Sequence, residues 1–83
     1  MLVRDQTKEK NRRKIVGEFI LEKRLSIGYT QTNLAYYLGV SGPEISQYER
    51  GVRSPGLVTF FKIAKYLKAE KEIGKLLDDI LAC

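Results

Sequence analysis

The sequence predicts an all-α fold of five helices in one small domain. Apolar residues recur at intervals of three and four in several segments, which is the spacing of a buried helix face, and no segment alternates with the period of two typical of a strand. Capping residues and glycines divide these segments into five. A chain of 83 residues has room for a single hydrophobic core.

The first helix is expected over residues 12–26. Val16, Phe19 and Ile20 lie on one stripe at helical spacing, and Gly28 ends the helix. Residues 1–11 are polar and show no periodicity, so we expect a basic arm there. The basic residues in and after this arm are Lys8, Lys10, Arg12, Arg13 and Lys14.

The second helix is expected to begin with Thr30 as its N-cap and to end at Leu38. Leu34, Ala35 and Leu38 share one side, which we expect to be buried, and Gly39 stops the helix.

The third helix is expected from Ser41 to about Gly51. Ser41 and Glu44 have the spacing of a capping box, in which each side chain bonds the other residue's backbone amide. Ile45 and Tyr48 are expected to point inward.

The fourth helix is expected to begin with Ser54 as N-cap and Pro55 in its first turn, and to run to about Leu67. One face is predicted to pack inward: Leu57, Phe60, Ile63, Ala64 and Leu67. Val58, Phe61 and Tyr66 lie off that face, which leaves apolar side chains without an obvious place in the core.

The fifth helix, over residues 69–81, carries a regular apolar stripe: Ile73, Leu76, Leu77, Ile80 and Leu81. This stripe either completes the core of the monomer or faces a second subunit. We favour the second subunit and expect a homodimer, because one small core does not need so much apolar surface. The expected dimer interface consists of Phe61, Ile73, Leu77 and Ile80.

Composition excludes most catalytic and metal sites. The chain has no histidine, and its one cysteine is Cys83. Disulfide frameworks, Cys/His zinc sites and histidine-dependent triads are therefore ruled out. We expect a non-enzymatic protein without metal or cofactor, and a cytoplasmic one, because no apolar targeting or membrane segment is visible. The net charge of +5 favours nucleic acid as a partner.

The segment between the second and third helices has the pattern of a helix-turn-helix. Such a turn needs a small residue where the helices nearly touch, a glycine that adopts a left-handed conformation, and an apolar residue after it. Ala35, Gly39 and Val40 occur in that order, and Ile45 follows to anchor the third helix.

With these residues in place, the chain resembles the lambda-repressor-like (Cro/cI, Xre-type) helix-turn-helix family over about residues 15–68. The matching residues are Thr30-Gln31, Leu34-Ala35, Leu38-Gly39-Val40-Ser41, Ile45-Ser46, Tyr48-Glu49-Arg50-Gly51, Pro55, Leu57, Ile63-Ala64 and Leu67. The resemblance implies a five-helix domain. It also implies that the third helix lies in the major groove of double-stranded DNA. We expect the helix-turn-helix DNA-binding domain over residues 12–68 and a C-terminal dimerisation helix over residues 69–83.

The resemblance also implies roles for individual residues. Gln31 is expected to bind a backbone phosphate, and Arg50 and Arg53 are expected to do the same after the third helix. Arg24 and Glu49 match a family pair that ties two helices together. The side of the third helix toward DNA presents Ser41, Gly42, Pro43, Glu44, Ser46 and Gln47.

Among these, Gln47 is the best base reader, because its amide matches N6 and N7 of adenine. Gly42 and Pro43 depart from the family pattern, since neither offers a side-chain hydrogen bond, and Glu44 is needed for the cap. Direct readout is therefore expected to be sparse, with DNA shape and arginine contacts contributing more. The basic arm either binds phosphates or stays solvated.

The sequence thus indicates a transcriptional regulator that binds a two-fold operator as a homodimer, of the compact phage-repressor or restriction–modification controller type. One alternative is the antitoxin of a toxin–antitoxin pair, whose surplus apolar surface binds a toxin protein. Another is a protein-interaction module that has kept the fold and lost DNA binding.

Overall fold

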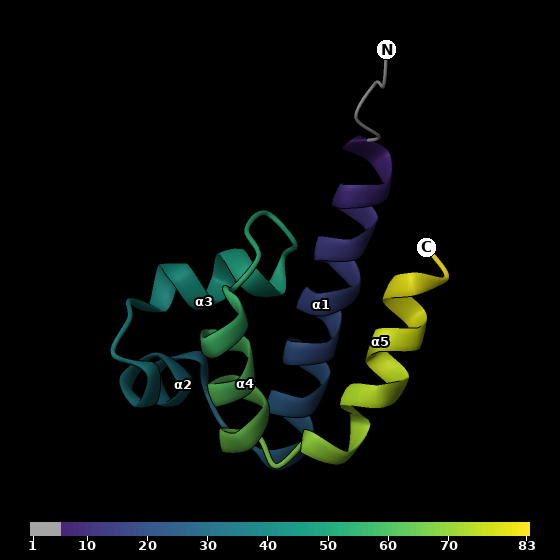
Figure 1. The fold of residues 1–83 in the computed structure, drawn as a ribbon. Helices are drawn as coiled ribbons and strands as arrows, with labels where there is room; N and C mark the ends of the chain where they lie inside the picture. The colour runs from purple at the N-terminus through teal and green to yellow at the C-terminus, as the bar shows by residue number, and fades with distance from the viewer. Residues whose placement is uncertain (1–5) are drawn as a thin grey trace.

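The computed structural model describes residues 6–83 and arranges them as a helical bundle (Figure 1). Across these residues the chain forms no strand, so the predicted all-α fold of five helices is confirmed. The elements are α1 (Gln6–Ile27), α2 (Gln31–Leu38), α3 (Gly42–Glu49), α4 (Leu57–Tyr66), a 3-10 turn η1 (Glu70–Glu72) and α5 (Ile73–Leu81).

The long helix α1 organises the others. It packs against α3 on one side and against α5 on the other, and α5 runs back antiparallel to it (Figure 1). The short helix α2 contacts α3 and α4 and closes the opposite side of the core. None of the helices in the described part of the chain is long and apolar enough to cross a membrane.

The largest fully buried side chains of the core come from the first four helices: Ile20, Leu34, Ile45 and Ile63. Burial of each such side chain contributes roughly 1.5–3 kcal/mol. Leu76 of α5 joins this core and is only 5% exposed. Helix α5 therefore contributes in part to the monomer core. From its apolar stripe alone, the sequence did not decide between the monomer core and a second subunit.

Helices α1 and α3 approach each other closely at Gly17. A Cβ atom at this position would lie 2.3 Å from the carbonyl oxygen of Tyr48 and 2.7 Å from that of Glu49. A glycine inside a helix lowers stability by about 0.5–1 kcal/mol relative to alanine. At this position it is needed because only a residue without a Cβ atom lets the two backbones approach so closely.

Helix α1 begins at Gln6, so the prediction that it starts at Arg12 is wrong. Thr7, Lys10, Asn11 and Arg12 are exposed, and a helical turn that buries nothing shows no apolar periodicity. Residues 6–11 of the predicted arm are therefore helical, and residues 1–5 lie outside the described residues.

Helix α4 also begins later than predicted, at Leu57 with Gly56 as its N-cap. The backbone amides of Val52 and Arg53 both donate to the Gln47 carbonyl, at 3.0 and 3.3 Å. These bonds hold residues 52–53 against the end of α3. Residues 54–56 then connect this segment to the first turn of α4. Leu57 is 72% exposed, so its predicted place in the core is wrong.

The start of the fifth helix differs from the prediction as well. The predicted helix over 69–81 is split into η1 and α5. Ala69 donates to the Ala64 carbonyl at 2.8 Å and accepts from the Glu72 amide at 3.1 Å. This tight turn directly after α4 gives the first turn its 3-10 geometry.

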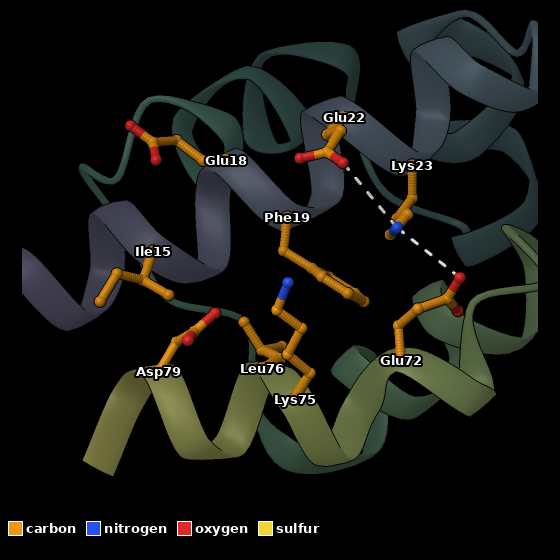
Figure 2. Close-up of a pocket in the computed structure, with 9 residues that line it drawn as sticks. All are labelled: Ile15, Glu18, Phe19, Glu22, Lys23, Glu72, Lys75, Leu76 and Asp79. Carbon is orange, nitrogen blue, oxygen red and sulfur yellow. Dashed lines mark ion pairs between the residues drawn. The ribbon is translucent and has the colours of Figure 1, made fainter. Parts of the chain in front are cut away.

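Polar and aromatic contacts hold the outer helices in place. Lys23 of α1 lies between Glu22 and Glu72, with ion pairs of 3.9 and 3.6 Å, over the Phe19 ring (Figure 2). The Lys23–Glu72 pair thus joins α1 to the beginning of α5, within the cleft shown in Figure 2.

A stack of tyrosines joins α2 to α4 on the other side of the bundle. The rings of Tyr37 and Tyr66 stack with centroids 4.1 Å apart, and Tyr29 lies 4.8 Å from Tyr66. Tyr66, which the sequence left off the inward face of α4, is thereby half-buried.

Candidate nucleic-acid interface

The turn between α2 and α3 is held by backbone bonds. Gly39 adopts φ 72°, a left-handed conformation that glycine enters without strain, and caps α2. The Val40 amide donates to the Ala35 carbonyl at 3.0 Å, and Val40 packs against the core cluster that contains the fully buried Ile45. The angle between α2 and α3 is therefore set by buried contacts.

The start of α3 is capped by Ser41, whose hydroxyl accepts from the Glu44 amide at 3.3 Å. The predicted capping box is wrong in its second half, because the Glu44 carboxylate accepts instead from the Tyr48 hydroxyl at 2.6 Å. Burial, then this hydrogen bond and the charge of Glu44, raise the pKa of Tyr48 above its ordinary value of 10.0. The reciprocal capping box forms in α2, between Thr30 and Asn33.

Helix α3 has one buried face and one open face. Ile45, Tyr48 and Glu49 are buried. The opposite side carries Pro43 and the half-buried Ser46 and Gln47, and Gly42 lies beside them. A Cβ at Gly42 would meet no described atom within 4 Å. The open face is thus available to a macromolecule along the length of the helix.

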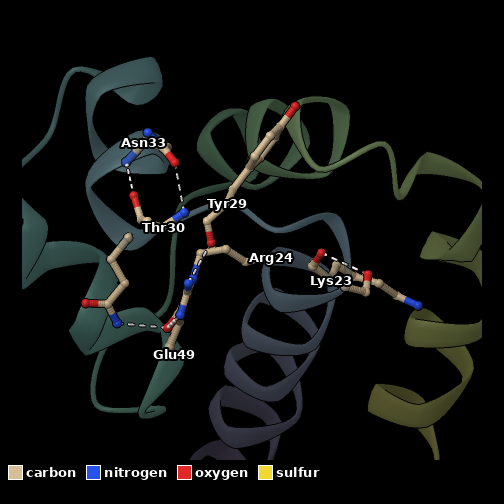
Figure 3. A network of polar contacts seen from close by, with 8 residues as sticks. Lys23, Arg24, Tyr29, Thr30, Asn33 and Glu49 are labelled. Carbon is tan, nitrogen blue, oxygen red and sulfur yellow. Dashed lines mark hydrogen bonds and ion pairs between the residues drawn. The ribbon is translucent and has the colours of Figure 1, made fainter.

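A buried ion pair ties α3 to α1 (Figure 3). Arg24 Nε donates to Glu49 Oε2 at 2.6 Å, and Arg24 Nη2 donates to Glu49 Oε1 at 3.1 Å. The two residues are 8% and 7% exposed. Arg24 Nη1 also donates to the Tyr29 carbonyl at 2.8 Å, so one guanidinium joins α1, α3 and the connection before α2.

Gln31, predicted as a phosphate ligand, also belongs to this network. Its Nε2 donates to Glu49 Oε1 at 2.9 Å, which holds the side chain at the beginning of α2. The sequence carries no signal for this contact, because the two residues are 18 positions apart on different helices. One carboxylate on the buried side of α3 thus contacts side chains from α1 and α2.

Basic residues from two distant segments meet at the end of α3. Arg13 Nε donates to the Gly51 carbonyl at 3.2 Å, and a Cβ at Gly51 would lie 2.9 Å from the Lys14 Cα. Arg50 and Arg53 flank Gly51 in the chain and are exposed. We call Arg13, Lys14, Arg50 and Arg53 the basic patch.

The residues predicted for a dimer interface line an apolar groove of about 390 Å³ between α1, α4 and α5. Phe61 and Leu77 are 49% and 52% exposed, whereas Ile73 and Ile80 are half-buried. The groove is lined by Val16, Ser54, Pro55, Leu57, Phe60, Phe61, Ile73, Leu76, Leu77 and Ile80.

Comparison with known proteins places this geometry in a family. The helix-turn-helix family model matches residues 20–72. Two uncharacterized HTH-type transcriptional regulators of Mycobacterium tuberculosis, from strains CDC 1551 / Oshkosh and ATCC 25618 / H37Rv, are each 39% identical over 57 residues. Those residues are 69% of this chain and 41% of each relative, so the chain spans less than half the length of these relatives. No solved structure matches the chain.

Proposed function

Because the chain belongs to the lambda-repressor-like helix-turn-helix family, we propose that it is a sequence-specific DNA-binding transcriptional regulator with α3 in the major groove. The observation that carries the proposal is the open face of α3, which is backed by buried Ile45, Tyr48 and Glu49. A helix held in this way presents its outer side chains to base edges at a defined depth.

Electrostatics supports the same partner. The chain has a net charge of +5, and the basic patch lies beside the end of α3. Arg53 and the α1 residues of the patch, Arg13 and Lys14, are proposed to bind phosphates flanking the bases that α3 reads. Gln31, at the beginning of α2, is proposed to bind a phosphate through the amide hydrogen that Glu49 does not take.

Base reading is proposed to depend on few side chains. Gln47 is the amide on the open face that matches adenine N6 and N7. Gly42 and Pro43 let the DNA approach closely but supply no side-chain hydrogen bond. Discrimination then depends partly on DNA shape.

A salt titration tests the proposal. Binding to a duplex selected from a random library should weaken steeply as salt rises, because phosphate binding releases counterions. Arg53→Ala should flatten the slope of log K against log salt by about one unit. Lys71→Ala, which removes the same charge from η1 at the far end of the bundle (Figure 1), is the matched control and should leave the slope unchanged. Affinity that does not respond to salt would refute the proposal.

The functional unit is proposed to be a homodimer whose apolar groove is covered by a second copy. Leu57, Phe61 and Leu77 expose 72%, 49% and 52% of their surface around this groove. An apolar patch shared by α4 and α5 is suited to self-association. A two-fold dimer would also present two α3 helices to a two-fold operator.

A further inference from the structure

Arg50 continues the open face of α3. Its backbone is helical, with φ −84° and ψ −3°, so the helical spacing extends one residue beyond Glu49. Pro43, Ser46, Gln47 and Arg50 therefore form one row at spacings of three and four residues. Arg50 is exposed at the end of this row.

The Arg50 side chain turns back along the helix. Its Nε donates to the Ser46 hydroxyl at 3.3 Å, four residues toward the N-terminus, as side chains on helices commonly lean. The Arg50 side chain is thus held along the open face beside Ser46. Within the described residues, no acceptor is paired with its Nη1 or Nη2.

Arg50 adds a charged donor to an open face whose neighbouring side chains, Ser46 and Gln47, are neutral. Gly42 and Pro43 have no side-chain donors, and the Glu44 carboxylate is engaged with the Tyr48 hydroxyl. Guanine presents two adjacent acceptors, O6 and N7, in the major groove, and the planar fork of a guanidinium matches both at once.

We propose that Arg50 reads a guanine in the major groove, and that Ser46 is a positioning residue that orients the Arg50 guanidinium. The proposal rests on the DNA-binding function proposed above. It assigns different roles to Arg50 and Arg53, which the resemblance expects to bind phosphates alike. The Arg53 backbone amide is bound to the Gln47 carbonyl at 3.3 Å, which places Arg53 in the loop after α3 and suits it to a phosphate.

Selection of duplexes from a random library with the full chain and four variants tests the proposal. Arg50→Ala should lose the preference for guanine at one position of each half-site by about 5- to 150-fold, with the other positions unchanged. Arg50→Lys keeps the charge but not the planar fork, so it should lose much of the same preference at an unchanged salt slope. Ser46→Ala should weaken that preference by less than Arg50→Ala does.

Arg53→Ala is the matched control and should lower affinity for all sequences without changing the selected motif. Thermal melting should be the same for all four variants, because the substituted side chains lie outside the core. If Arg50→Ala selects the wild-type motif with a uniform loss of affinity, Arg50 binds a phosphate and the inference is overturned while DNA binding stands. A wild-type chain that enriches no motif and binds DNA independently of salt would overturn the proposed function itself, and this inference with it.

Discussion

Replacement of Glu49 by alanine should destabilise the fold strongly. The substitution removes the two carboxylate acceptors of the Arg24 guanidinium, at 2.6 and 3.1 Å, and the acceptor of the Gln31 amide. Arg24, which is 8% exposed in the wild-type protein, would keep only the Tyr29 carbonyl as an acceptor and would carry an uncompensated charge. This is the costly outcome when a buried pair loses one member.

The expected loss is about 3–5 kcal/mol, the range for breaking a buried ion pair. A domain of 83 residues has a total stability of roughly 4–12 kcal/mol, so the substitution would remove a quarter of it at the least. Each kcal/mol corresponds to about 4–8 °C in a domain of this size. The melting midpoint should therefore fall by roughly 12–40 °C.

Urea and thermal unfolding at neutral pH, followed by circular dichroism, measure this effect. Glu72→Ala is the matched control, because Glu72 pairs with Lys23 at 3.6 Å with 46% of its side chain exposed. Such a pair contributes about 0–1 kcal/mol. Replacing both buried partners, as in Arg24→Met with Glu49→Leu, should recover much of the loss.

If Glu49→Ala loses no more stability than Glu72→Ala, the buried ion pair does not stabilise the fold as expected. That result would mean that water reaches Arg24 in the folded protein, and that the pair does not hold α1 and α3 together. A fold that melts normally but no longer binds DNA would likewise assign Glu49 to the interface and not to the fold.

Four further outcomes are expected. Gly17→Ala should cost about 1–3 kcal/mol in urea unfolding, because its Cβ would meet the Tyr48 carbonyl at 2.3 Å, whereas Gly42→Ala should cost nothing; equal effects would contradict the close approach of α1 and α3. Folding raises the pKa of Tyr48 above its ordinary value of 10.0, so the unfolded chain loses the hydroxyl proton at lower pH than the folded protein does. The protonated hydroxyl therefore stabilises the folded state fully below pH 10.0, and this stabilisation is lost as pH rises through the folded pKa. The wild-type melting midpoint should accordingly fall more steeply above about pH 10 than that of Tyr48→Phe, and parallel curves would exclude the effect. Leu77→Asp should split the proposed dimer in sedimentation experiments and leave the monomer folded, since Leu77 is 52% exposed. Leu76→Ala, at a position 5% exposed, should instead lower the free energy of unfolding by about 2–5 kcal/mol. A Leu77→Asp protein that remains dimeric would exclude the groove as the interface. Gln47→Ala should relax discrimination at one base pair per half-site by about 1–3 kcal/mol at an unchanged salt slope, and an equal loss on specific and random DNA would show that Gln47 reads no base.

Features that depend on neighbours in the chain were predictable from the sequence. The left-handed Gly39, the apolar Val40 after it and the caps at Thr30 and Ser41 involve contacts within about five residues. The pairing of Arg24 with Glu49 spans 25 positions and followed only from the family resemblance. Local hydrogen bonds and helical periodicity leave a pattern in the sequence because both partners lie within one or two turns.

Features that depend on how the helices are placed were decided by the tertiary structure. Periodicity assigned Leu57 and Leu76 alike to apolar stripes, but only Leu76 has a neighbouring helix to cover it, while Leu57 is 72% exposed. Gly17 and Gly51 are required by backbones that approach from distant parts of the chain. The contact of Arg13 with Gly51 spans 38 positions and brings the basic patch together. Such contacts depend on the angle and distance between packed helices, which the sum of many buried contacts determines and no local pattern records.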